Sequence, residues 1–189
     1  MHGTEILTTI AQLAIGVIGF SGIAIAFNRQ PGRLNDWEAF RVLILFANGF
    51  AAAFLSLLPF AFFYLDWSDA AVWRTSSGAC ALFEIVFLYA QTAPTRKMIG
   101  EHRELFNMAL LALMISGHSL NTLLQVSNAL GLVGSRTLPI FIFGVLWLLF
   151  QSVFQFGRIL FVQPLSGGAV SHSAPGDSRK ENSERGHSA

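Results

Sequence analysis

The sequence has little charge and almost no cysteine. Asp, Glu, Lys and Arg make up 12% of its 189 residues, about half the share found in a typical soluble domain. So few charged side chains cannot cover a water-soluble globule of this size. The single cysteine, Cys80, excludes an internal disulfide and a multi-cysteine metal site. A net charge of +1 without a dense basic run argues against nucleic acid as a partner.

Catalytic signatures are missing as well. The sequence contains neither the H-E-x-x-H pattern of zinc proteases nor the G-x-S-x-G turn of serine hydrolases. A bis-histidine haem needs two histidines at matched depth in the membrane, and only His118 falls inside an apolar stretch. We therefore expect a protein that is not an enzyme and that carries no cofactor and no metal.

Long apolar stretches are what the sequence does contain. Hydrophobic residues make up 53% of the chain. Five stretches reach the roughly 20 residues that a helix needs to cross a bilayer, and their continuity favours helices over the short alternating strands of a membrane barrel. The sequence predicts an all-α, polytopic membrane helical bundle of five transmembrane helices, at 6–27, 39–64, 70–92, 105–130 and 138–162.

Polar segments separate these stretches and follow the last one. Pro94-Thr95-Arg96-Lys97 is expected to open the third connection. Residues 1–163 then form one transmembrane domain. From 164 to 189 the sequence turns to Ser, Gly, His and alternating charges, which cannot bury enough apolar surface to offset the entropy of ordering. We expect a disordered tail there and no soluble domain of useful size.

The positions of the basic residues predict the orientation. Of the 12 lysines and arginines, ten lie beside the first connection, beside the third connection or toward the C-terminus. Only Arg74 and Arg136 fall on the opposite side. By the positive-inside rule, this distribution places the N-terminus outside and the C-terminal tail in the cytoplasm.

Small residues form a face on each of the first two predicted helices. On the first, the residues that share one side are Gln12, Gly16, Gly19, Gly22, Ile23 and Ala26. On the second, Asn48, Ala52 and Ser56 recur at every fourth position. Small residues let membrane helices approach closely, so both faces predict packing, either within one chain or between chains. Besides the lipid bilayer, the expected partners are therefore further copies of the chain or another membrane protein.

The Gly19-Phe20-Ser21-Gly22 run resembles one found in small multi-spanning bacterial membrane proteins without an assigned role. The resemblance covers one helix of the five and implies no function. With the predicted orientation, it leads us to expect a multi-pass protein of the bacterial inner membrane.

Polar residues within the last three spans share narrow faces. On the fourth span, one stripe lies within about a third of the helix circumference and comprises Asn107, Met114, His118, Asn121, Thr122, Gln125 and Asn128. The fifth span carries Gln151, Gln155 and Arg158 at i, i+4 and i+7. Lipid cannot satisfy such groups, so they must face other helices or water.

Glu84, near the centre of the third span, is expected at about the same depth as His118 and Gln151. A carboxylate and an imidazole at one depth can pair, either both neutral or as an ion pair. We name the combined set the polar seam. Its members are Glu84, His118, Asn121, Gln125, Asn128, Gln151, Gln155 and Arg158.

Two functions fit the polar seam. In the first, an oligomer forms a pathway for protons, ions or small solutes, with Glu84 as gate or proton carrier and His118 as its partner. Asn121, Gln125 and Asn128 then line the outer half, and Gln151, Gln155 and Arg158 the inner half. In the second, the seam only locks helices together, and the protein is a non-transporting scaffold or an accessory subunit of a larger membrane complex.

Overall fold

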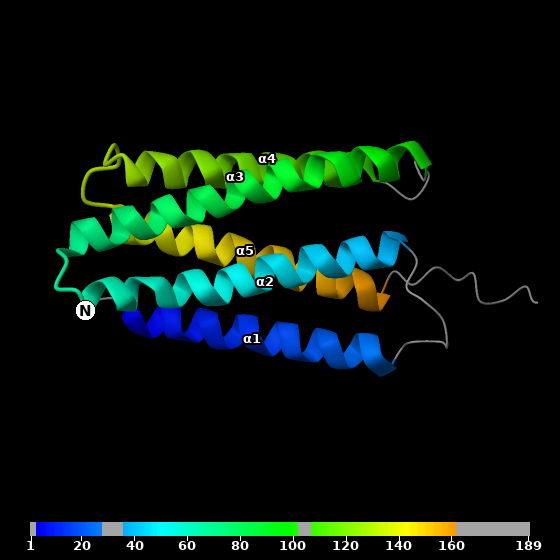
Figure 1. Ribbon diagram of the computed structural model, residues 1–189, viewed down its shortest axis with the longest axis horizontal. Helices are drawn as coiled ribbons and strands as arrows, with labels where there is room; N and C mark the ends of the chain where they lie inside the picture. Colours follow the sequence, from blue (N-terminus) through cyan, green and yellow to red (C-terminus); the bar gives the residue numbers. More distant parts are fainter. Residues whose placement is uncertain (1–2, 28–35, 102–106, 162–189) are drawn as a thin grey trace, which may run out of the picture.

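The computed structural model describes residues 3–27, 36–101 and 107–161, and five α-helices make up most of these ranges. They are α1 (Thr4–Phe27), α2 (Asp36–Phe63), α3 (Asp69–Glu101), α4 (Met108–Ala129) and α5 (Thr137–Phe161). Successive helices run antiparallel, so α1 begins and α5 ends at opposite ends of the bundle (Figure 1).

The predicted all-α fold is confirmed for the described residues, where all five helices are long and apolar enough to cross a membrane. The protein is thus a multi-pass helical membrane protein by the length and composition of its helices. Which end of the bundle faces the cytoplasm stays a prediction. The predicted start of the fourth helix at Leu105 and the predicted tail at 164–189 lie outside the described residues.

The predicted end of the third helix at Thr92 is wrong, because α3 continues through Pro94 to Glu101. Proline removes one backbone N–H, but membrane helices tolerate it where nearby side chains satisfy the backbone. The carbonyl that loses its helical donor to Pro94 is that of Ala90, four residues earlier. In the same turn the hydroxyl of Thr92 donates to the neighbouring carbonyl of Tyr89, at 2.6 Å. The segment 94–97 therefore extends α3 instead of opening a connection.

Hydrogen bonds cap both ends of α4, the helix that carries His118, Asn121, Gln125 and Asn128. At the start of α4, Asn107 accepts a hydrogen bond from the Leu110 backbone N–H at 3.1 Å. At its end, Gly131 has φ +76°, and the N–H groups of Gly131 and Leu132 donate to the carbonyls of Asn128 and Ser127. This pattern is a Schellman motif, which needs the left-handed conformation that glycine adopts without strain.

Helices α2 and α5 form the centre of the bundle. Helix α1 packs on α2 and α5, whereas α4 packs on α3 and α5, so α1 and α4 lie at opposite edges (Figure 1). Leu7, Leu45 and Phe141, from α1, α2 and α5, are fully buried between these helices. The bundle is therefore held by an apolar core on the α1 side and, as described below, by polar contacts on the α4 side.

The described outer surface is strongly apolar. Large side chains such as Phe20, Phe54 and Leu123 are two-thirds exposed. Many polar side chains within the helices are instead buried, among them Glu84, Asn121 and Asn128. This distribution is the reverse of that in a water-soluble protein, and it suits a bundle that is surrounded by lipid.

The structure buries the small-residue face of α2 but not that of α1. On α2, Asn48, Ala52 and Ser56 are all fully buried, so this face packs within the chain. On α1, the buried residues lie on another face and are Leu7, Ile10, Ala11, Ala14 and Ser21. Gln12 and Gly19 are exposed. A side chain added at Gly16, Gly19 or Gly22 would meet no described atom of the other helices within 4 Å.

Candidate functional site

An ionisable pair lies at the centre of the α3–α4 contact. The Nδ1 atom of His118 is 2.5 Å from the Oε2 atom of Glu84. A proton must lie between these atoms, because an unprotonated ring nitrogen and a carboxylate oxygen repel each other. The Asn121 amide donates to the other carboxyl oxygen of Glu84 at 2.7 Å. Both carboxyl oxygens are thus held, and the Glu84 side chain is fully buried.

Aromatic rings fix the orientation of the His118 ring. Its centroid lies 5.3 Å from that of Phe87 and 5.8 Å from that of Trp147, with Trp147 nearly perpendicular at 83°. Gly117 makes room for Trp147, since a Cβ at this position would collide with the indole. Because the imidazole is held by Glu84 on one side and by two rings, its Nε2 atom is the one left for exchange with a ligand or a proton.

The outer half of the polar seam is closed by direct hydrogen bonds. The Gln125 amide donates to the Ile140 carbonyl of α5 at 2.7 Å. The Asn128 amide donates to the Ser77 hydroxyl of α3 at 2.6 Å and to the Thr137 carbonyl at 2.7 Å. These two amides therefore tie α4 to both of its neighbours.

Close packing supports these hydrogen bonds. Gly144 on α5 lets Gln125 approach, since a Cβ there would overlap the Gln125 amide. Asn121 also donates to the Gly144 carbonyl, at 3.4 Å. We call Asn121, Gln125 and Asn128 clamps, because the amide of each donates a hydrogen bond from α4 to a neighbouring helix.

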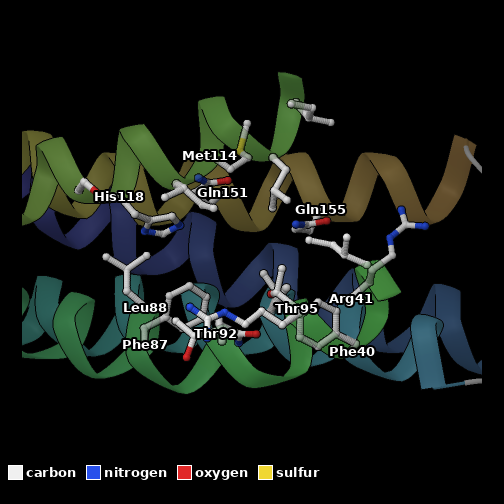
Figure 2. Close-up of a pocket in the computed structure, with 18 of the residues that line it drawn as sticks. Phe40, Arg41, Phe87, Leu88, Thr92, Thr95, Met114, His118, Gln151 and Gln155 are labelled. Carbon is white, nitrogen blue, oxygen red and sulfur yellow. The ribbon is translucent and has the colours of Figure 1, made fainter. Parts of the chain in front are cut away.

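The inner half is a pocket of about 550 Å³ between α3 and α4, with α2 and α5 also contributing. His118 lies at one end and Arg41 at the other, with Gln151 and Gln155 between them (Figure 2). Gln151 and Gln155 are 2% and 7% exposed, yet the Gln151 Nε2 and Gln155 Oε1 atoms have no hydrogen-bond partner among the described residues. Arg158 is half-buried and also lines the pocket.

The structure brings together all eight residues of the predicted seam, but in two different environments. Asn121, Gln125 and Asn128 are clamps, whereas Gln151, Gln155 and Arg158 line the pocket. Glu84 and His118 lie where the two halves meet.

Sequence reasoning missed Arg41, Gln91 and Trp147. In the sequence, Arg41 is only one of the basic residues that indicate orientation. In the structure it lines the pocket and is 6% exposed. Gln91 is also a pocket residue, and it follows Glu84 by two helical turns. That spacing is the signal that could have found it. Asn107 belongs to the predicted stripe of the fourth span, and it lines the pocket as well as capping α4.

Metal ligands do not gather at this site. Within the part of the chain that the structure describes, no three His, Cys, Asp or Glu side chains are placed to hold a metal ion. The ionisable groups that remain are suited to holding or moving a proton, and the arginines to holding an anion.

Comparisons with protein-family models, with curated proteins and with solved structures found no match for this chain.

Proposed function

We propose that the pocket is the open half of a pathway for protons or small solutes, and that the Glu84–His118 pair is its gate. One observation carries this proposal: the pocket ends at His118, whose ring contacts the fully buried Glu84 carboxyl group. An ionisable residue in the interior of a membrane helix is costly, and substrate pathways and proton relays are among the functions that such residues serve.

The pair has the geometry of a proton relay. A proton arriving from the pocket would bind Nε2 of His118, and the proton on Nδ1 would pass to Oε2 of Glu84 across 2.5 Å. Amide side chains cannot continue this relay, because they do not titrate near neutral pH. Release to the opposite side would therefore require the Gln125 and Asn128 clamps to separate from α5, or an oligomer to complete the route.

Flux through reconstituted protein tests the proposal. Liposomes that contain the protein and a trapped pH-sensitive dye should dissipate a pH gradient faster than empty liposomes. We expect Glu84→Gln to reduce this rate at least about tenfold, because it removes the only titratable group of the gate besides His118. The measurement is the initial rate of dye response after a pH jump.

A matched variant controls for the substitution itself. Glu101→Gln makes the same change on the same helix, at an exposed side chain outside the pocket. It should leave the rate unchanged. A normal rate in Glu84→Gln would contradict the proposal.

The second candidate is a scaffold or an accessory subunit that transports nothing. The α1 face that contains Gln12 and Gly19 supports it, because this face is exposed in the bundle and an amide in contact with lipid lacks hydrogen-bond partners. We propose that a further copy of the chain, or another membrane protein, covers this face. Under this candidate, liposomes that contain the protein stay as tight as empty ones, and truncating Gln125 lowers thermal stability alone.

The orientation and location are part of the proposal. The positive-inside rule supports a cytoplasmic C-terminus, and the Gly19–Gly22 resemblance supports the bacterial inner membrane. The pocket end that contains Arg41 and Arg158 would then face the cytoplasm. Tags at the two termini should be labelled from opposite sides of the membrane, and labelling of both from one side would contradict this topology.

A further inference from the structure

The pocket combines an apolar wall with a basic end. Leu88 of α3 and Leu110, Leu111 and Met114 of α4 contribute aliphatic surface along it. Its far end from His118 carries Arg41 (Figure 2). Arg96 and Arg158 also line the pocket. A pocket that served only water or protons would need no such apolar wall, so these features together select a ligand with two chemically different parts.

The charges at the basic end are arranged for an anion. Arg41 is 6% exposed, Arg158 is near enough for the two like charges to repel, and Glu38 supplies opposite charge to Arg41. Two guanidinium groups that line one pocket and repel each other favour an anionic group between them, and the planar guanidinium suits a carboxylate or a phosphate. Glu38 itself does not line the pocket within the described residues.

Two buried amide atoms point to a ligand as well. Gln151 and Gln155 are more than nine-tenths buried and line the pocket. The Gln151 Nε2 donor and the Gln155 Oε1 acceptor have no hydrogen-bond partner in the described part of the chain. The amide oxygens of Gln125 and Asn128 are also unpaired in the described part of the chain, but of these four amides only Gln151 and Gln155 line the pocket. A polar group or water held between the two ends of the pocket can therefore reach them and satisfy them.

The lipid-facing surface gives access to the pocket. Tyr89 of α3 and Ile115 of α4 line it, and they are 81% and 47% exposed on the outside of the bundle. The opening therefore lies between α3 and α4, on a surface that faces acyl chains. A ligand dissolved in the bilayer can enter there, whereas a small aqueous anion has no need of this route.

We propose that the pocket binds a single-chain amphiphile with an anionic headgroup, a carboxylate or a phosphate. The headgroup lies at Arg41 and Arg158, and the chain extends along the wall that contains Leu111 and Met114 toward His118. The volume of about 550 Å³ falls within the range of roughly 300 to 1,000 Å³ that small-molecule pockets occupy. This inference rests on the proposed function, since it names the solute class of the same pocket.

Equilibrium binding of radiolabelled hexadecanoate to the purified full chain in mild detergent tests it. Unlabelled hexadecanoate and hexadecyl phosphate should compete. Hexadecyltrimethylammonium, with the same chain and the opposite charge, should compete at least about tenfold more weakly. Equal competition by the cation would overturn the proposal. Butyrate and inorganic phosphate represent the aqueous source of the same anionic chemistry, and competition by either at the level of hexadecanoate would also overturn it.

Three variants assign the binding to this pocket. Arg158→Gln should weaken hexadecanoate binding at least about tenfold, because it removes a charge-assisted hydrogen-bond donor from the headgroup. Met114→Trp should also weaken it, because it fills the space of the chain and leaves both arginines in place. Arg74→Gln is the matched control at an exposed arginine outside the pocket, and it should bind as the unaltered protein does. Equal affinity in all three variants would overturn the assignment.

The experiments can reject the amphiphile proposal and the pathway proposal independently of each other. Loss of proton flux in Glu84→Gln, together with no saturable hexadecanoate binding, would reject the amphiphile and keep the pathway. Saturable binding that depends on Arg158, without flux above empty liposomes, would keep the amphiphile site and reject the pathway.

Discussion

Both halves of the polar seam contain buried amide side chains, but those of the outer half join helices and those of the inner half line a pocket. In the outer half, the amides of Gln125 and Asn128 donate to backbone carbonyls of α5 at 2.7 Å each. In the inner half, Gln151 and Gln155 are also buried, but neither amide bonds a neighbouring helix among the described residues, and both line a pocket. The amide oxygens of Gln125 and Asn128 have no described partner either, so an unpaired atom alone does not separate the halves. The comparison shows that a buried amide in a membrane helix is not by itself a functional signal. What distinguishes the halves is whether a neighbouring helix supplies an acceptor for the amide N–H groups.

Breaking a clamp should have the largest effect. Gly144→Ala places a Cβ against the Gln125 amide and displaces it from the Ile140 carbonyl. We expect the free energy of unfolding to fall by about 2 to 4 kcal/mol, since overpacking adds to the loss of a buried hydrogen bond. Thermal unfolding in mild detergent, followed by circular dichroism, measures this change.

Gly157→Ala is the control on the same helix. A Cβ at Gly157 meets no described atom of the other helices within 4 Å, so the higher helix propensity of alanine should raise stability by up to about 1 kcal/mol. Equal effects at Gly144 and Gly157 would mean that the clamp does not hold the helices.

A second pair of substitutions compares the two halves through smaller changes in the free energy of unfolding. Asn128→Leu removes the side-chain donor to the Thr137 carbonyl and to the Ser77 hydroxyl, and should cost about 1 to 2 kcal/mol. Gln155→Met removes an amide oxygen that has no described partner, so stability should change by less than about 0.5 kcal/mol. Chemical or thermal unfolding of both variants in one detergent gives the difference. A larger loss in Gln155→Met than in Asn128→Leu would reverse the assignment of the two halves.

Much of the fold could be predicted from the sequence, because lipid imposes a simple rule on length and polarity. Five apolar stretches gave five helices, and burial of the polar stripe followed from the cost of an unpaired amide in hydrocarbon. The equal depth of Glu84 and His118 was also expected, and the contact between them fits it. Depth is readable since an α-helix rises 1.5 Å per residue.

Other features depend on which helices are neighbours, and depth does not determine that. Gln125 and Gln155 each belong to a polar stripe along a predicted helix. Only the packing shows that Gln125 is a clamp and that Gln155 lines the pocket. The predicted end of α3 at Thr92 is wrong because Pro94 is a local signal for a helix end, whereas membrane helices tolerate an internal proline and α3 continues to Glu101. Arg41 was missed because its burial arises from α2 packing beside α5.

A small effect on folding is also expected at the α1 face, where the comparison extends from contacts within the chain to contacts between chains. Gly19→Ile fills open space in the bundle, so the free energy of unfolding should change by less than about 1 kcal/mol. If a second copy packs on this face, however, the isoleucine blocks the close approach that small residues allow. Light scattering in mild detergent should then show an oligomer for the unaltered chain and a smaller species for Gly19→Ile. Gly100→Ile makes the same change at another open, exposed position, on α3, and should preserve the oligomer. A monomer in all three proteins, or an oligomer in all three, would place the α1 face against lipid, and the exposed Gln12 amide would then need water or a lipid headgroup as its partner.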